Sequence, residues 1–378
     1  TSGVYTDVSL KNLTFVNSTA NRAFNVRYLT MEGCIVDNVG QLYAQSNPSR
    51  VVLRNVTWSH SKNLMMYNCE IYDSLFENIT TTGTGVFWLT TNTNDDMIII
   101  RNSKFINITN TGNTGAVMYV QGDFVSINNT YASNKATKAD YGVLYVSADN
   151  AVSIDDIFID NSAADNYGAA FFIGRNPDSV IGIYNAKFIN NTAGANGGAL
   201  GTNGAVLFNC TFENNRAGAN GGAIYAVSHT SSYSYFDNLT FTNVTFKGND
   251  ADGNGQDIFI ETKNPINCNV GGMTVSFNDL STTTLQDFVS ANVTHTSGAI
   301  IGGGKVTFYL NGSYMGVADV IDGVATLDYL GFKKNGTFVL SGEYNLATDD
   351  TVYNNATVVV ALAPLKDNVT LYVSDSKG

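Results

Sequence analysis

The sequence predicts an all-β protein, in which a right-handed parallel β-helix is followed by a small antiparallel β-sandwich. Three observations predict this fold. A glycine-rich decapeptide occurs twice, the short segments before it alternate between apolar and polar residues, and the last part of the chain has longer alternating segments joined by hairpin turns. No segment sustains the apolar stripe at i, i+3, i+4 and i+7 that marks an amphipathic helix.

The repeat is the first element to justify. Residues 191–200, NTAGANGGAL, return as NRAGANGGAI at residues 215–224. In each copy an aromatic residue, Phe188 or Phe212, lies three positions before the first Asn. Weaker copies follow Phe158 and Phe246. Repetition at a spacing of roughly 20 to 30 residues is typical of a solenoid, in which each unit buries its apolar face against its neighbours.

The segment before each repeat has the period of two that marks a β-strand. Its inward-facing pairs are Leu13 and Phe15, Val56 and Trp58, Ala186 and Phe188, Cys210 and Phe212, and Val244 and Phe246. The corners between these strands are too short for ordinary parallel crossovers, so the pattern predicts a parallel β-helix with coils about 4.8 Å apart. Aligning the inward position predicts about ten coils within residues 1–284, at Phe15, Val36, Trp58, Phe76, Phe105, Tyr131, Phe158, Phe188, Phe212 and Phe246.

Five successive coils carry an Asn three residues after the aromatic position. These residues are Asn134, Asn161, Asn191, Asn215 and Asn249. An Asn amide both donates and accepts hydrogen bonds, and Asn tolerates the left-handed backbone region. We therefore expect a buried ladder that satisfies backbone groups at the corners. Earlier coils carry Ser18, Val39, Ser61, Ile79 and Ile108 at this position, so their corners should be closed differently.

The composition fits an extracellular β-protein and argues against two classes of partner. Of the 378 residues only 14% are charged, with a net charge of −12, so no basic stripe is available for nucleic acid or an anionic membrane. The sequence has no run of about 18 apolar residues, so direct membrane insertion is not expected. The first residues lack a signal-peptide pattern, and the abrupt ends suggest a fragment of a longer chain from which any signal peptide has been removed.

The cysteines and the sequons each leave two readings open. Cys34, Cys69, Cys210 and Cys268 lack metal-type spacing, and we expect buried free thiols, with a Cys34–Cys69 disulfide as the alternative. About fifteen Asn-x-Ser/Thr sequons are present, among them Asn12, Asn55, Asn107, Asn243, Asn311 and Asn335. A repeat rich in Asn and Thr would produce such triplets by chance, whereas a secreted chain could carry glycans on them.

Residues 285–378 are predicted to form the separate sandwich. The strand 305–310 leads into Asn311-Gly312, and the strand 316–320 leads into Asp322-Gly323; both dipeptides favour tight hairpin turns. Further strands are expected at 289–296, 324–329, 337–341 and 355–362. Six or seven short strands at this spacing are typical of an antiparallel sandwich.

The Phe-x-x-Asn and Gly-Gly-Ala-Ile/Leu elements resemble the repeats of chlamydial polymorphic membrane proteins. The arrangement is still more similar to the adhesin-like surface proteins of methanogenic archaea, in which such repeats precede bacterial-type immunoglobulin-like (Ig-like) domains. The segments 307–312, 323–327 and 354–358 resemble those domains. The resemblance implies a cell-surface location, cell-wall anchoring and an Ig-like sandwich. Its motifs indicate the fold and the type of repeat far better than they indicate an activity. Coils before Phe105 depart from the pattern.

Three local patterns suggest chemistry, and each has a structural explanation. The spacing of Asp250, Asp252, Asn254 and Glu261 fits an EF-hand loop, but it lies in register with the repeat corners, and no helix flanks it. Asp155-Asp156 is similar to the adjacent aspartates of galacturonases, yet the companion His-Gly and Arg-x-Lys motifs are missing. Residues 302–305, GGGK, are expected to be a plain loop between two sandwich strands. The sequence thus predicts no catalytic residues, no metal and no cofactor.

Four long connections interrupt the otherwise short corners, at residues 44–50, 90–97, 174–179 and 227–235. Because all four leave from the same point of the coil, we expect them to form one flank of the rod. They supply the candidate ligand-binding residues Arg50, Asp95, Asp96, Arg175, Asp178, His229, Tyr233 and Tyr235. The predicted function is an extracellular adhesin that binds a cell-surface glycan or protein of a host or a neighbouring microbe. The alternatives are a structural stalk without a ligand and a carbohydrate-active β-helix enzyme.

Overall fold

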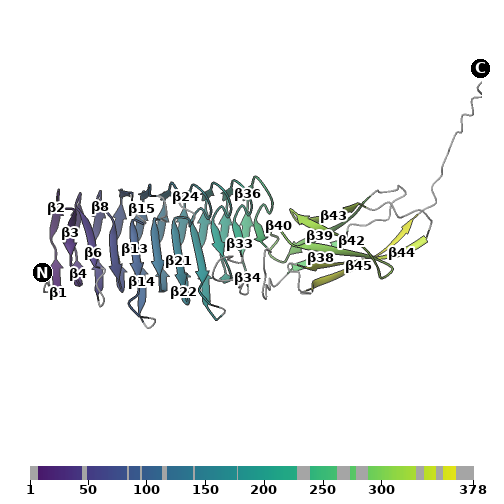
Figure 1. Cartoon of the computed structure of the whole chain (residues 1–378), viewed down its shortest axis with the longest axis horizontal. Helices are drawn as coiled ribbons and strands as arrows, with labels where there is room; N and C mark the ends of the chain where they lie inside the picture. The colour runs from purple at the N-terminus through teal and green to yellow at the C-terminus, as the bar shows by residue number, and fades with distance from the viewer. Residues whose placement is uncertain are drawn as a thin grey trace, which may run out of the picture.

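The computed structural model is a straight rod of coils followed by a second, smaller β unit (Figure 1). It describes residues 7–44, 49–82, 85–93, 96–112, 117–138, 141–176, 178–227, 239–261, 273–277, 288–328, 336–345 and 352–362, of which 273–277, 336–337 and 352–362 are described at the level of the backbone. The described part of the chain contains no helical segment of the length and hydropathy that a bilayer crossing requires.

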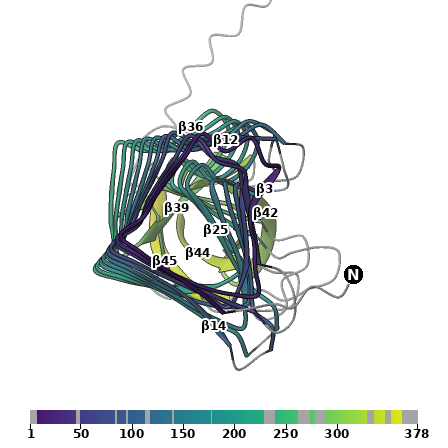
Figure 2. The same ribbon diagram turned by 90° about the vertical axis from the view of Figure 1, so that its left-hand side faces the viewer.

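Four parallel sheets, named A, B, D and C in chain order around the coil, form the walls of the rod (Figure 2). Sheet A consists of β1 (Asp7–Lys11), β4 (Tyr28–Glu32), β7 (Arg50–Arg54), β10 (Cys69–Tyr72), β14 (Met97–Arg101), β18 (Asp123–Ile127), β22 (Asn150–Ile154), β26 (Val180–Tyr184), β30 (Ala205–Phe208) and β34 (Leu239–Thr242). Sheet B consists of β2 (Thr14–Val16), β5 (Ile35–Asp37), β8 (Thr57–Ser59), β11 (Leu75–Glu77), β15 (Lys104–Ile106), β19 (Thr130–Ala132), β23 (Ile157–Ile159), β27 (Lys187–Ile189), β31 (Thr211–Glu213) and β35 (Thr245–Lys247).

Sheet D is short and begins in the fourth coil. It consists of β12 (Thr80–Thr81), β16 (Thr109–Asn110), β20 (Lys135–Ala136), β24 (Ser162–Ala163), β28 (Thr192–Ala193), β32 (Arg216–Ala217) and β36 (Asp250–Ala251). Sheet C consists of β3 (Arg22–Asn25), β6 (Gln41–Ala44), β9 (Leu64–Tyr67), β13 (Phe87–Thr90), β17 (Met118–Gln121), β21 (Leu144–Ala148), β25 (Ala170–Gly174), β29 (Leu200–Thr202), β33 (Ile224–Val227), β37 (Ile258–Glu261) and β40 (Ile301–Gly302). The predicted parallel β-helix is therefore confirmed.

The predicted alignment of coils is confirmed along sheet B. Its ten strands pair in the expected register, from Phe15 opposite Val36 at one end to Phe212 opposite Phe246 at the other. Within the rod the rings of Phe188 and Phe212 stack with centroids 4.7 Å apart and an interplanar angle of 3°. The stack extends without a break through Phe76, Phe105, Tyr131, Phe158, Phe188, Phe212 and Phe246. Rings in equivalent positions thus fill the interior between sheets.

The predicted asparagine ladder is present and buried. The Nδ2 of Asn191 donates to Asn215 Oδ1 (3.0 Å) and to the Phe158 carbonyl (3.0 Å), while Asn215 Nδ2 donates to Asn249 Oδ1 (3.0 Å). One expectation needs correction. The left-handed conformation belongs to the exposed residue before each ladder position, as at Asn190 (φ 54°), because that residue makes the sharp bend and the ladder side chain then points inward.

The three cysteines in the described residues are free and buried, as predicted, and Cys268 lies outside these residues. Cys210 Sγ donates to the Ile183 carbonyl at 3.3 Å, so its thiol joins the corner hydrogen bonds. Burial raises the pKa of Cys210 to about 11. The alternative Cys34–Cys69 disulfide is absent.

The second unit is an antiparallel sheet that curls into a nearly closed barrel or sandwich. Its order is β38 (Met273–Phe277), β39 (Phe288–His295), β43 (Val324–Asp328), β42 (Ser313–Ile321), β41 (Lys305–Leu310), β44 (Gly336–Asn345) and β45 (Val352–Leu362), and β38 also contacts β45. Asn311 and Gly312 have φ values of 51° and 78°, as the predicted hairpin turn requires. The strand β38 was not predicted, and it lies on the other side of the expected boundary at 284/285 from its partner β39.

The two units share a strand. After β39 the chain returns to the rod, where β40 pairs in parallel with β37 as the last strand of sheet C. The GGGK segment was expected between two sandwich strands, and this expectation was wrong. Gly302 ends the β-helix strand β40, and Lys305 begins β41. Asp322 Oδ1 accepts the backbone N–H of Gly255 (2.7 Å) from the last corner of the rod. These contacts join the second unit to the last coil of the rod.

Candidate binding surface

The four long connections leave the rod at one corner, as predicted. They join β6 to β7, β13 to β14, β25 to β26 and β33 to β34, where sheet C passes to sheet A. In the other coils this corner takes only one or two residues, such as Asn68 between β9 and β10. Figure 2, which looks along the rod, shows loops projecting below the label of β14 at this corner. We call this edge the loop corner.

Of the eight predicted ligand-binding residues, the structure describes four, and these lie at three different levels along the rod. Asp95, His229, Tyr233 and Tyr235 lie outside the described residues. Arg50 begins β7 on the outer face of sheet A, and its Nε donates to Glu70 Oε1 at 3.0 Å. The Asp96 carboxylate is occupied within its own loop, since it accepts from N and Oγ1 of Thr93, both at 3.0 Å. Asp178 is exposed in the loop that precedes β26.

Arg175 is the predicted residue that reaches the outer face of sheet C. Its Nε lies 3.4 Å from Ser147 Oγ on β21. Its charge also acts on the phenols of Tyr119 and Tyr145, which lie on neighbouring strands. The loop corner and the outer face of sheet C are therefore one continuous surface at this point.

The outer face of sheet C carries a row of mostly aromatic side chains that sequence reasoning missed. Because side chains alternate across a strand, the residue after the first buried residue of each strand, a Leu, Ile, Phe, Met or Ala, points outward. These outward residues lie opposite one another in successive coils: Tyr43, Met65, Trp88, Tyr119, Tyr145, Phe171, Gly201, Tyr225 and Phe259. We call this set the aromatic row. In the sequence, the aromatic row could have been found from the residue after each inward apolar residue of these strands, such as Tyr225 after Ile224.

The rings of the aromatic row contact one another along the rod. The centroids of Tyr119 and Tyr145 are 4.8 Å apart, and their planes differ by 17°. Trp88 lies 5.2 Å from Tyr119 with a tilt of 49°, and Tyr141 lies 4.8 Å from Tyr145 with a tilt of 52°. Because Tyr119 and Tyr145 stack on each other, they present ring edges and hydroxyl groups to solvent rather than full ring faces.

Gly201 is the one gap in the aromatic row, and another ring fills it. A Cβ at Gly201 would lie 2.2 Å from Cδ1 of Tyr167, so only glycine leaves room for that ring. Tyr167 comes from the preceding corner, stacks on Phe171 at 4.1 Å and lies 6.1 Å from Tyr225. Phe171, Tyr167 and Tyr225 are 1%, 8% and 7% exposed, so this part of the row is covered. The half-buried members of the aromatic row are therefore Tyr43, Met65, Trp88, Tyr119, Tyr145 and Phe259, and Tyr141 lies beside Tyr145.

Polar groups border the accessible rings. Gln121 Nε2 donates to the hydroxyl of Tyr119 at 3.0 Å. Burial raises the pKa of Tyr145 to about 12, and burial followed by the neighbouring Tyr141 raises that of Tyr119. Both phenols are therefore protonated at neutral pH and available as hydrogen-bond donors beside the cationic Arg175.

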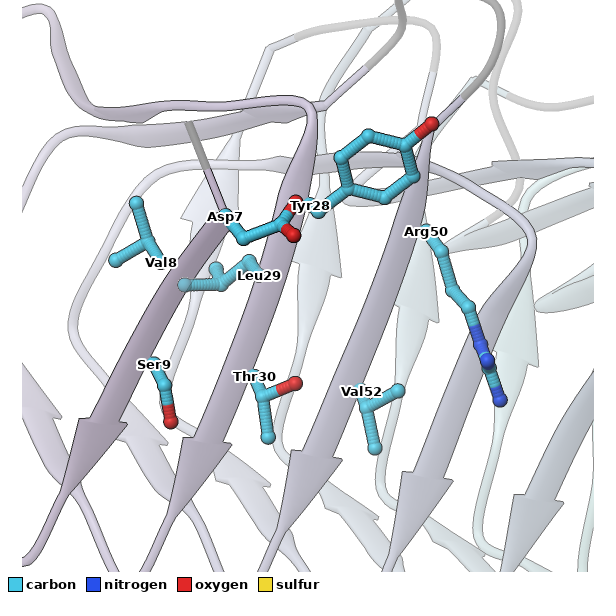
Figure 3. Close-up of a pocket in the computed structure, with 8 residues that line it drawn as sticks. All are labelled: Asp7, Val8, Ser9, Tyr28, Leu29, Thr30, Arg50 and Val52. Carbon is cyan, nitrogen blue, oxygen red and sulfur yellow. The ribbon is translucent and has the colours of Figure 1, made fainter. Parts of the chain in front are cut away.

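A separate shallow hollow lies on the outer face of sheet A near the N-terminal end of the rod (Figure 3). It has a volume of about 260 Å³ and is lined by Asp7, Val8, Ser9, Tyr28, Leu29, Thr30, Arg50 and Val52. Ligand pockets usually hold about 300 Å³ or more. The hollow would thus accept one small polar group rather than enclose a ligand.

The carboxylates that the sequence singled out do not share a surface. Asp155 is exposed at a corner and accepts from Asn185 Nδ2 at 2.9 Å, whereas Asp156 is fully buried and accepts from Ser153 Oγ at 2.6 Å. Of the EF-hand-like residues, Asp250 and Asp252 pair with Arg216, and Asn254 Nδ2 donates to the Val320 carbonyl at 3.2 Å. In the described residues no group of His, Cys, Asp and Glu is arranged to hold a metal ion.

The comparison with known families gives one match. A Chlamydia polymorphic membrane protein repeat matches residues 209–227, which span β31, β32 and β33. A search of curated proteins finds no match. The matched segment contains Phe212, Asn215 and the second Gly-Gly-Ala-Ile element, so it coincides with the coil that contributes a ring to the interior stack and an Asn to the ladder. The chain is thus a parallel β-helix that carries a Chlamydia polymorphic membrane protein repeat.

Proposed function

We propose that this chain is part of an extracellular adhesin, held at the cell surface, whose rigid β-helix presents the aromatic row and the loop corner to a glycan of another cell. The matched repeat suggests a surface protein, and this supports the location. The resemblance to adhesin-like proteins of methanogenic archaea and the assignment of the second unit as an Ig-like sandwich are part of the same proposal. A surface protein of the host or of a neighbouring microbe is the alternative ligand.

The observation that carries the proposal is the accessible middle part of the aromatic row beside Arg175. Trp88, Tyr119 and Tyr145 are half-buried and stand on a rigid sheet, so binding would cost little side-chain entropy. Phenol hydroxyls, the Gln121 amide and the Arg175 guanidinium offer hydrogen bonds at the rim of this apolar strip. Apolar ring edges combined with such groups suit a sugar, which has hydroxyls around a C–H surface.

A glycan array and a cell-binding assay on the 378-residue chain test the proposal. We expect Tyr119→Ala and Arg175→Gln each to lower binding by roughly tenfold, since each removes contacts worth about 1.4 kcal/mol or more. Lys104→Ala is the matched control, because Lys104 is exposed on sheet B, away from the aromatic row. If Lys104→Ala lowers binding as much as Tyr119→Ala does, this surface is rejected as the binding site. The same holds if neither Tyr119→Ala nor Arg175→Gln lowers binding.

A structural stalk is the second candidate function, and one observation favours it. Tyr119 and Tyr145 stack on each other as the interior rings do, so the row could serve stability alone. In that case Tyr119→Ala should lower the melting temperature without any change in adhesion. The carbohydrate-active enzyme stays a hypothesis without a specific observation in its favour.

A further inference from the structure

The outer face of sheet A is divided into a polar half and an apolar half. In the first four coils its central and flanking positions include Arg50, Arg54, Glu70 and Tyr72, and Glu70 accepts from the Tyr72 hydroxyl at 2.9 Å. From β14 to β30 most of these positions are apolar. The exceptions are the charged Arg101 and Asp123 at the borders, the exposed Asn150 and the glycine Gly182. The apolar set, here called the apolar patch, consists of Met97, Ile99, Val125, Ile127, Val152, Ile154, Val180, Tyr184, Val206 and Phe208.

Four side chains of the apolar patch are exposed and the other six are half-buried. Val180 is 56% exposed, Phe208 46%, Met97 43% and Val206 38%. A soluble protein rarely leaves a contiguous apolar patch of several hundred Å² uncovered unless the patch contacts a partner. Sheet A, which carries the apolar patch, and sheet C, which carries the aromatic row, are two different walls of the rod that meet at the loop corner (Figure 2). The two surfaces can therefore be occupied at the same time.

We propose that two copies of this chain associate side by side and antiparallel through the apolar patch. A flat array of side chains at a regular spacing along a straight rod is complementary to a second copy of itself, and a two-fold axis makes each contact twice. In the antiparallel arrangement the coil of β14 faces the coil of β30 of the second copy, and Val152 on the middle strand lies near the axis. A parallel arrangement would instead place the charged cluster of Arg50, Glu70 and Arg54 opposite its own copy.

The size of the patch fits a weak dimer. Five strands spaced about 4.8 Å apart and five residues of about 3.3 Å each give a projected face of about 400 Å² on each copy. The accessible area is larger than this projection because side chains stand up from the sheet. The total buried area of such a contact is therefore at the low end of specific interfaces, near about 1,000 Å². Self-association should accordingly be measured at protein concentrations of up to tens of micromolar.

Sedimentation of the 378-residue chain tests the association. We expect a reversible monomer–dimer equilibrium that Val206→Glu shifts to roughly tenfold higher concentration or abolishes. Ile35→Glu is the matched control, because Ile35 is a comparably exposed apolar residue (49%) on sheet B, and this variant should dimerise like the parent. A parent that stays monomeric at these concentrations, or a dimer that Val206→Glu leaves intact, overturns the proposal.

Cysteine cross-linking tests the two-fold geometry. Val152→Cys places a thiol beside its own copy across the axis, so oxidation should give a disulfide-linked dimer. Lys187→Cys, exposed on sheet B, should not cross-link above the background of the parent chain. Far-ultraviolet circular dichroism of each variant shows whether it is folded. A folded Val152→Cys protein that cross-links no better than Lys187→Cys contradicts the antiparallel arrangement.

Discussion

At the scale of single residues, the ladder asparagines each perform several tasks at once. Asn215 Nδ2 donates to the Phe188 carbonyl at 2.9 Å, and its Oδ1 accepts from the backbone N–H of Asn191 at 3.0 Å. Each side chain thus satisfies buried backbone groups of the neighbouring coil, which water cannot reach. An Asn in this column is therefore part of the backbone hydrogen bonding of the rod.

Asn215→Ala should lower the free energy of unfolding by about 1–3 kcal/mol, because it leaves buried donors and acceptors unsatisfied. Urea unfolding followed by circular dichroism measures this loss. Asn214→Gly is the control, since Asn214 is exposed and its φ of 54° is one that glycine adopts freely. Equal stability of the two variants would contradict the ladder's role.

Phe212→Ala should lower the free energy of unfolding by about 3–5 kcal/mol, because it opens a cavity in the interior stack. The ring has neighbours on both sides, Phe188 at 4.7 Å and Phe246 at 5.3 Å. Phe246→Ala removes a partly buried ring at the end of the stack and should cost less. The same denaturation series compares the two, and a larger loss for Phe246→Ala would argue against the stack as the source of stability.

Asp156 should make the protein less stable as the pH rises from about 4 to 6. Burial raises its pKa from 3.8 to about 6 in the folded state, so in this window the folded chain holds a proton that the unfolded chain has released. Asp156→Asn keeps the shape and has no charge to bury. At pH 7 the variant should therefore gain stability relative to the parent, on the order of 1–3 kcal/mol.

Urea unfolding of both proteins at several pH values between 4 and 7 tests this prediction. The difference in unfolding free energy between variant and parent should grow with pH, because other titrating groups are common to both. A difference that stays constant over this range would mean that the pKa of Asp156 is the same in the folded and unfolded chains, and it would contradict the prediction.

At the scale of elements, the sheet C strands of the rod carry different kinds of side chain on their two faces. In β33, for example, Ile224 and Ala226 are fully buried in the interior, whereas Tyr225 belongs to the aromatic row. The connections at the end of these strands contribute no residue to the interior ring stack or to the asparagine ladder. Their length can therefore vary without changing the coil register.

Shortening residues 227–235 to a tight turn should leave folding intact and weaken adhesion. Coils such as β17 to β18 already make this corner through Gly122 alone, so a short turn is compatible with the rod. Circular dichroism checks the fold, and the cell-binding assay checks adhesion. A shortened protein that binds cells as well as the parent would show that this connection is dispensable and would support the stalk.

At the scale of the whole molecule, the second unit also completes the rod. The strand β40 covers the edge of β37, and Asp257 links the ladder to it, since Asp257 Oδ2 accepts from the Ile300 N–H at 2.9 Å and Asp257 Oδ1 accepts from Asn249 Nδ2 at 2.9 Å. An uncovered edge of a parallel sheet can pair with other chains. The second unit therefore protects the sheet C edge of the rod from such pairing.

A chain that ends at residue 284 should lose β40 and expose the edge of β37. We expect it to aggregate or to melt at a lower temperature than the 378-residue chain, as size-exclusion chromatography and thermal unfolding would show. Asp322→Ala in the full chain is the milder test, since it removes only the contact to Gly255. A monomeric truncated chain with an unchanged melting temperature would mean that the two units are independent.

The sequence by itself determined the coil register, the interior ring stack, the asparagine ladder and the common corner of the long connections. These features are readable because each coil must place one side chain of a given kind at the same interior point, so the requirement repeats along the chain. The hairpins at Asn311-Gly312 and Asp322-Gly323 are readable because their backbone conformations are local.

Only the tertiary structure decided which outer surfaces become continuous. Tyr167 fills the gap at Gly201 from a different coil, and β40 joins the rod from beyond β39, and neither contact repeats from coil to coil. The aromatic row and the apolar patch depend on which face of each strand meets solvent across many coils. Interior positions are constrained in every coil. The outer side chains, by contrast, form a continuous surface only when the coils are stacked.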